Sequence, residues 1–137
     1  IYLADDSDTI KKQVKMMYTD PNHININDKG SVKGNIVFTY LDAFCRPEHF
    51  TRYLPEYANL DELKNHYKRG GLGDVKIKNF LNEILQEILA PIRARREEFA
   101  KDKGEVMQIL FKGSDFARET ANKTLEEVKE AMGIKYR

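Results

Sequence analysis

Apolar residues recur at intervals of three and one along the stretch 75–101, the spacing that keeps one face of an α-helix in a core. Asp74 stands just before this stretch, where its carboxylate can accept hydrogen bonds from the first helical turn. A glycine-rich segment at 70–73 permits a sharp turn into the helix. Pro91 lies inside the pattern and has no N–H for the Glu87 carbonyl, so it predicts a bend. The chain is therefore organised on one long Pro-kinked helix, whose apolar positions are Ile77, Phe80, Leu81, Ile84, Leu85, Ile88, Leu89 and Ile92.

Four shorter segments before this helix also carry helical signals. A first helix opens in the acidic stretch 5–9 and ends at Asp20-Pro21. A second follows Asn35 over 36–44; a buried strand at 37–40 is the alternative, and helix is favoured because no other segment offers a sheet partner. A short helical turn is predicted over 48–54. Another helix over 60–69 begins at a capping box and stops at Gly70.

The last segment carries apolar residues at helical spacing from Val106 to Met132, after a turn at 102–104. Gly113 leaves open whether this helix breaks, and continuity is favoured since a glycine inside a helix costs only ~1 kcal/mol. Gly133 is a helix stop. The sequence predicts an all-α fold, a helical bundle.

Composition limits the class of protein further. With 137 residues, a net charge of +1 and 33% charged residues, the chain reads as one ordinary globular domain and not as a strongly basic nucleic-acid binder. No apolar run reaches the length of a membrane span. The single cysteine, Cys45, excludes an internal disulfide and fits a cytoplasmic location. Because the chain opens at Ile1 without methionine, we interpret it as a piece of a longer protein.

Candidate catalytic and metal-binding groups are few. Cys45 and His49 are four residues apart, as in a Cys–His nucleophile pair, but Pro47 between them favours a core residue closing a helix. The histidines are scattered and no second cysteine exists, so no metal site is predicted. The glycines at 70–73 resemble a phosphate-binding turn, yet Asp74 would place a carboxylate where phosphate should lie. We predict neither catalytic residues nor a metal.

Two basic clusters are candidates for contact with RNA. Arginine and lysine beside aromatic rings suit single-stranded RNA, because bases stack on rings and phosphates need donors. The alternative is that these residues form solvated helix faces balanced by Glu97 and Glu98. The candidate residues are Tyr67, Lys68, Arg69, Lys76 and Lys78 around the glycine turn, and Arg93, Arg95 and Arg96 beyond Pro91.

Several short motifs occur in register with one known family. They are HYKRGGLGDVKIK at 66–78 and APIR at 90–93, preceded by IYLADD at 1–6, TIKK at 9–12, TDP at 19–21 and VFTYLD at 37–42. Together they resemble the C-terminal helical part of bacterial tryptophanyl-tRNA synthetase, and the resemblance spans nearly all of the chain.

The resemblance implies a class I synthetase that activates tryptophan with ATP and Mg and transfers it to tRNA. Both class signatures are absent here, which implies that the Rossmann catalytic domain lies outside this chain and that the fragment has no activity and no cofactor of its own. Residues 1–8 would be the link from the catalytic signature loop, and residues 9–137 the domain that binds the anticodon region of tRNA. The implied partners are tRNA and the catalytic domain. The parent would be a cytoplasmic homodimer, and the fragment alone a monomer.

A helical protein-interaction module that does not bind RNA is the alternative function. The salt dependence of binding distinguishes these two functions. RNA binding should weaken steeply as salt rises, because it releases counterions, whereas binding through an apolar interface should change much less.

Overall fold

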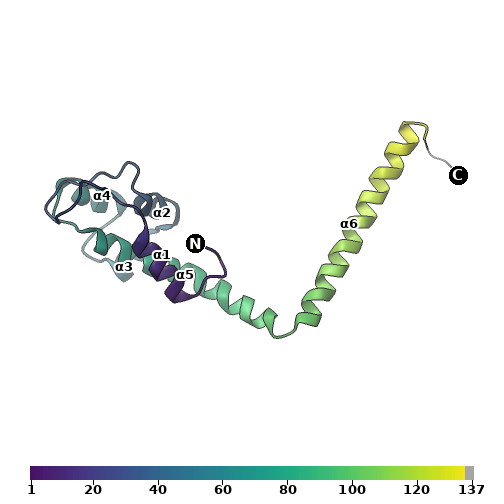
Figure 1. The fold of residues 1–137 in the computed structure, drawn as a ribbon, viewed down its shortest axis with the longest axis horizontal. Helices are drawn as coiled ribbons and strands as arrows, with labels where there is room; N and C mark the ends of the chain where they lie inside the picture. Colours follow the sequence, from purple (N-terminus) through teal and green to yellow (C-terminus); the bar gives the residue numbers. More distant parts are fainter. Residues whose placement is uncertain (135–137) are drawn as a thin grey trace. The chain divides into compact units, whose positions relative to one another are not determined.

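The computed structural model describes residues 1–134, and these residues form helices and no strands (Figure 1). The helices are α1 (Ser7–Met16), α2 (Ile36–Phe44), α3 (Pro47–Tyr53), α4 (Leu60–Arg69), α5 (Asp74–Ala100) and α6 (Lys103–Ala131). The predicted all-α class is confirmed. The chain divides into two compact units, one comprising Ile1–Ala94 and the other beginning at Arg95.

Local signals account for most helix starts. The Asn35 side chain accepts a hydrogen bond from the Val37 N–H, and the Asn59 side chain accepts one from the Glu62 N–H. Asp6 and Asp102 cap α1 and α6 in the same way. The strand alternative at 37–40 is therefore wrong. In a standard capping box, the Glu62 carboxylate would accept a hydrogen bond from the backbone N–H of the cap residue, Asn59. In α4 it accepts instead from the Ala58 N–H, at 2.7 Å, one residue before the cap.

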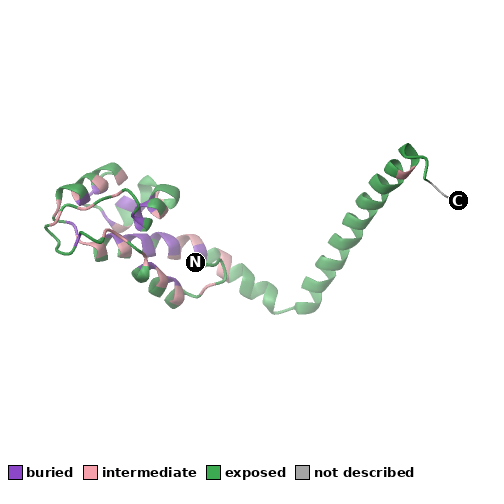
Figure 2. Cartoon of the chain, turned by 45° about the horizontal axis from the view of Figure 1, so that its top comes forward, coloured by how far each residue is buried: buried purple, intermediate pink, exposed green. Residues whose placement is uncertain are grey.

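The core of the first unit lies along α5. Residues Ile77, Leu81 and Ile84 of α5 are completely buried, and α1, α2 and α4 contribute Ile10, Leu41 and other residues to the same cluster. Figure 2 shows this burial on α1–α5. The predicted α5 periodicity is thus confirmed, and the helix continues through Pro91.

Several helix boundaries differ from the prediction: α3 and α5 each lie one residue earlier at both ends, and two differences, at the end of α1 and the start of α5, have a structural reason. α1 ends at Met16, four residues before Asp20, where Met17 leaves the helical conformation at ψ 136°. Asp74 does not precede α5 as a cap but is its first residue, and its carboxylate bonds to side chains from other segments. A tertiary role has therefore replaced the predicted capping role.

α6 runs unbroken through Gly113, which confirms the favoured interpretation, but it differs from a helix of a packed bundle. None of its residues is buried, and its large apolar side chains range from 41% exposed at Val106 to 73% at Phe116. Within the first unit, α1–α4 and the first part of α5 form a packed bundle of the kind that the periodicity predicts.

Gly30 provides a test of how tightly the loop before α2 packs on the core. A Cβ at this position would lie 2.3 Å from the ring of Tyr67, which is completely buried. We expect Gly30→Ala to lower the free energy of unfolding by roughly 2 kcal/mol or more, because the ring has no space to move into. Urea denaturation measures the change.

Gly113→Ala is the matched control, since a Cβ there meets nothing within 4 Å. It should leave the stability of the first unit unchanged and raise helicity in α6, as alanine favours a helix interior by about 1 kcal/mol over glycine. Equal effects of the two substitutions would contradict the described packing.

Candidate functional site

The Asp74 carboxylate joins three segments at the start of α5. The Tyr67 hydroxyl on α4 donates to Oδ1 at 2.7 Å, and the Thr19 hydroxyl donates to Oδ2 at 2.9 Å. Nδ1 of His23, whose side chain is nearly inaccessible, lies 3.4 Å from Oδ1. The Asn35 amide in turn donates to the Tyr67 hydroxyl at 3.3 Å. The pKa of the Tyr67 hydroxyl is raised, mainly because the group is buried and secondly because it donates a hydrogen bond to Asp74.

Backbone contacts fix the glycine turn between α4 and α5 against the loop that precedes α2. The Gly71 N–H donates to the Ile26 carbonyl at 2.7 Å, and the Gly30 N–H donates to the Tyr67 carbonyl at 3.0 Å. Gly70 has φ 91°, and a Cβ there would lie 2.4 Å from the Asn27 carbonyl oxygen. Only glycine permits this close approach with a positive φ. The backbone of the glycine turn is therefore packed and hydrogen-bonded against the loop before α2.

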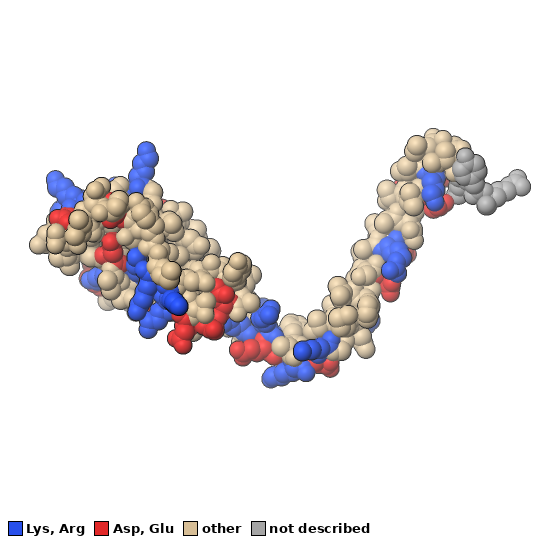
Figure 3. Space-filling view, in the orientation of Figure 1, with Lys and Arg blue, Asp and Glu red and all other residues tan. Residues whose placement is uncertain are grey.

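The first basic cluster divides into exposed and engaged side chains. Lys68 and Arg69 end α4 and are both exposed. Lys76 forms an ion pair with Glu56, and Lys78 donates to the Lys15 carbonyl at 3.0 Å. Figure 3 shows lysine and arginine side chains interspersed with acidic ones on the visible face. The exposed cations at the end of α4 are thus the ones immediately accessible to an anion.

Tyr67 does not have the surface position that the stacking hypothesis needs. Its side chain is completely buried, with its ring 5.0 Å from that of Phe38 and 4.7 Å from that of His23. In this structure it packs in the core and positions Asp74, and its ring is inaccessible to a base.

The three arginines fall in different units. Arg93 belongs to the first unit and donates to the Gln86 side-chain oxygen at 3.0 Å, while the Gln86 amide donates to the Ser7 carbonyl at 2.9 Å. This chain of hydrogen bonds ties the start of α1 to α5. Arg95 and Arg96 belong to the second unit and are exposed.

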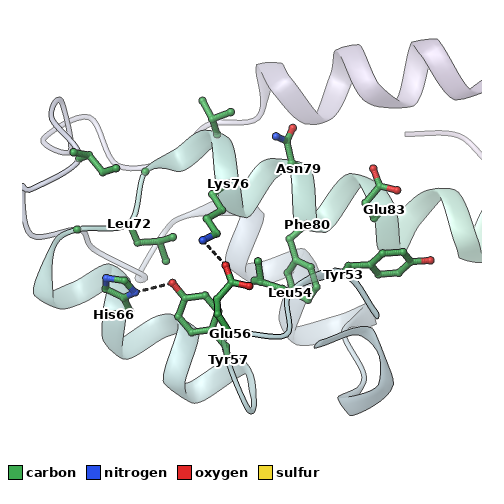
Figure 4. Close-up of a pocket in the computed structure, with 14 residues that line it drawn as sticks. Tyr53, Leu54, Glu56, Tyr57, His66, Leu72, Lys76, Asn79, Phe80 and Glu83 are labelled. Atoms are coloured by element: carbon green, nitrogen blue, oxygen red, sulfur yellow. Dashed lines mark hydrogen bonds and ion pairs between the residues drawn. The ribbon is translucent and has the colours of Figure 1, made fainter. Parts of the chain in front are cut away.

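A hollow of about 600 Å³ lies between α5, the glycine turn and the segment joining α3 to α4 (Figure 4). Leu54, Leu72 and Phe80, each at most 5% exposed, line its apolar side. The Tyr57 hydroxyl lies 2.7 Å from Nδ1 of His66. Figure 4 shows Lys76 directed from α5 toward Glu56 beside this pair.

Sequence reasoning does not find Glu56, Tyr57 and His66 of this hollow. His66 appears there as one of three scattered histidines and as the first residue of the motif at 66–78, without an assigned role, and Glu56 and Tyr57 belong to no motif. Periodicity places each residue on its own segment and does not report which segments meet. The one available signal is the proximity of His66 to the glycine turn.

The surroundings of Cys45 and His49 do not suit nucleophilic catalysis. Burial, with a smaller contribution from Glu48, raises the pKa of the Cys45 thiol to about 11. Nδ1 of His49 accepts a hydrogen bond from the Arg46 N–H at 2.9 Å and so helps to begin α3. The sulfur is therefore a thiol at neutral pH, and the imidazole has a structural partner.

Neither a metal site nor a membrane span is found in the described residues. In residues 1–134, no three His, Cys, Asp or Glu side chains gather as a metal site requires. No helix in the described part of the chain is both long and apolar enough to cross a membrane.

Tyr67→Phe tests the Asp74 network. The substitution keeps the buried ring but removes the hydroxyl that donates to Asp74, so we expect the free energy of unfolding to fall by about 1–2 kcal/mol. Denaturant titration of the chain measures it. Tyr18→Phe, at a position 56% exposed, is the control and should change stability little. A stability loss no larger than that of the control would contradict the network.

The raised pKa of Cys45 predicts its reactivity. Because only the thiolate reacts, alkylation by iodoacetamide should be slow at pH 7 and should rise about tenfold per pH unit up to pH 10 without a plateau. Cys45→Ser should remove the reaction. A plateau near pH 7 would instead indicate an activated thiolate.

The similar sequences and the similar solved structure come from the same group of proteins. No family model matches the chain. Tryptophan–tRNA ligases from Clostridium longisporum and Streptococcus pyogenes are 58% and 57% identical to it over 136 residues, and that from Streptococcus pneumoniae is 55% identical. Each alignment covers 99% of this chain but only 37–38% of the relative. A tryptophanyl-tRNA synthetase structure from Campylobacter jejuni shares the fold, with a TM-score of 0.72 over 97% of this chain and 38% of that chain at 22% identity.

The motifs at the glycine turn and the long helix therefore lie in a chain that is similar throughout to these relatives. The resemblance stated from the sequence is confirmed: the chain is similar over 99% of its length to bacterial tryptophan–tRNA ligases, and it spans a little over a third of their length.

Proposed function

We propose that this chain is the C-terminal helical domain of a tryptophan–tRNA ligase and binds the anticodon region of tRNA. The observation that carries the proposal is the 58% identity over 136 residues to a protein of that name. The all-helical fold agrees with it, since no Rossmann sheet is present in residues 1–134. Exposed cations at the end of α4 supply donors for phosphates.

In this proposal the full-length protein activates tryptophan with ATP and Mg and transfers it to tRNA, with its catalytic domain outside this chain. Residues 1–8 form the link to that domain, and residues 9–137 form the RNA-binding part. Cytoplasmic location, a homodimeric parent and a monomeric fragment stay predictions.

We assign the phosphate contacts to the cations of both basic clusters. Lys68 and Arg69 are accessible without rearrangement, whereas Lys76 and Lys78 must exchange existing partners. Arg95 and Arg96 present exposed side chains from the second unit. Of the candidate residues, Tyr67 has a supporting role, because its hydroxyl positions Asp74.

A protein-interaction module is the second candidate function, and the exposed apolar face of α6 favours it. Val106 and Leu110, which are four residues apart on one face of α6, are 41% and 57% exposed, and exposed apolar surface marks interaction sites. Binding through this face would change little between low and high salt.

Reversing charge at the end of α4 tests the RNA assignment. In the full-length protein, Lys68→Glu with Arg69→Glu should weaken tRNA binding at least about tenfold. It should also reduce the slope of log K against log salt by about 0.7–0.9 for each phosphate that the variant no longer neutralises. Filter binding at several salt concentrations measures both quantities.

Lys33→Glu is the control, because Lys33 is exposed on the first unit but belongs to neither basic cluster. It should change affinity much less. If the double variant binds tRNA with unchanged affinity and slope, the assignment of phosphate contacts to Lys68 and Arg69 is wrong.

A further inference from the structure

We infer that the apolar face of α6 docks on the catalytic domain of the full-length protein. This inference rests on the proposed function, which places that domain outside this chain, and it adds the surface that holds the two together. Four observations carry it: the exposure of α6, the threonine hydroxyls on its apolar face, a hollow at its beginning, and the width of its apolar side.

One side of α6 is continuously apolar and exposed. At 3.6 residues per turn, the side chains that lie within about 60° of one another, here called the apolar face of α6, are Val106, Leu110, Ala117, Ala121 and Val128. No residue of α6 is buried (Figure 2). Long helices in proteins gain most of their stability from packing such a face, and Gly113 inside α6 lowers its intrinsic helix propensity further. The apolar face therefore needs a partner surface.

The threonines on or beside this face do not oppose its burial. The Thr120 hydroxyl donates to the Phe116 carbonyl at 3.1 Å, and the Thr124 hydroxyl donates to the Thr120 carbonyl at 3.2 Å. Burying a hydroxyl is costly mainly when the group has no hydrogen-bond partner. Because the helix backbone already supplies one for each threonine, an apolar surface can cover both.

A hollow of about 570 Å³ opens at the beginning of the apolar face. Its lining residues, all in the second unit, are Arg96, Phe99, Ala100, Lys103, Val106 and Met107. Phe99 and Met107 are 54% and 45% exposed, so an apolar side chain that entered the hollow would cover them. The lining contains two cations and no carboxylate. The matching surface is therefore apolar, with an acidic side chain where it meets Arg96 and Lys103.

The apolar side of α6 is wider than the pairing of two helices requires. Ile109 and Phe116 extend it along one edge, and Met107 and Leu125 extend it along the other, so that it covers about half of the helix circumference. A two-stranded coiled coil uses a narrow seam, whereas a helix that packs on a folded domain carries a broader apolar sector. This width favours a folded surface over a second copy of α6.

The full-length protein offers such a surface in its catalytic domain. The buried core of the first unit lies between Ile10 and Leu89, so it is complete without α6. The aligned region is only 37–38% of the length of the tryptophan–tRNA ligases, so more than half of their length lies outside it. A domain in the same polypeptide is present at high effective concentration, which favours its docking over that of a separate protein.

Hydrogen exchange of the full-length protein tests the inference, with Leu110→Asp as the variant. In the unchanged protein, we expect the amides of α6 to exchange at least about a hundredfold more slowly than in an unstructured peptide, because an undocked helix opens readily. Leu110→Asp should reduce this protection to about tenfold or less. It should also lower the protection of a segment of the catalytic domain, and this second change identifies the surface that α6 covers.

Gln108→Asp is the matched control, since Gln108 lies on the opposite side of the same helical turn and is exposed. It introduces the same carboxylate and should leave both protections unchanged. Unprotected α6 amides in the unchanged full-length protein would overturn the inference, whatever the variants do. Protection lost only within residues 1–94 would assign the face to the first unit, and protection that disappears on dilution would assign it to a second copy; either result also overturns it.

Filter binding of tRNA to the same proteins separates this inference from the proposed function. A full-length protein that binds tRNA while its α6 amides stay unprotected overturns the inference alone. A full-length protein that shows the expected exchange pattern but does not bind tRNA overturns the proposed RNA-binding role alone.

Discussion

A single carboxylate, that of Asp74, connects segments that are far apart in the sequence. It accepts hydrogen bonds from Tyr67 on α4 and from Thr19 in the segment after α1, and it lies beside the imidazole of His23. Hydrogen bonds to an ionised group are stronger than those between neutral groups. This contact therefore fixes the start of α5 against the end of α4, and the glycine turn between them has little freedom. The hollow and the cations at its edge depend on that geometry.

The same constraint explains the burial of Tyr67. The loop before α2 approaches its ring so closely that position 30 has no space for a Cβ, and the glycine turn hydrogen-bonds to the same loop. A tyrosine flanked by basic residues suggested RNA stacking, but its hydroxyl and ring are both used in the interior. Residue type and neighbours along the chain therefore did not predict the role of this side chain.

Local structure could be predicted from the sequence, and tertiary contacts could not. The bounds of α2 and α4 follow from the side chains of Asn35 and Asn59 and from a helical period, which are short-range signals. By contrast, the ion pair of Glu56 with Lys76 and the contact of Tyr57 with His66 join separate elements. No periodicity encodes such pairs. The apolar residues of α6 show a second limit of sequence analysis. Their helical spacing predicts that one face of the helix packs against something, but it does not identify the partner.

The cations around the glycine turn differ in how far their charge is already balanced. Lys68 and Arg69 are exposed, which is why the proposed function assigns the first phosphate contacts to them. Lys76, although part of the same sequence motif, is neutralised by Glu56 and contributes little long-range attraction. Lys76 and Glu56 instead form an ion pair beside the apolar side of the hollow, formed by Leu54, Leu72 and Phe80. The basic motif at the glycine turn therefore combines two exposed cations at the end of α4 with a lysine at the beginning of α5 that is already neutralised by Glu56.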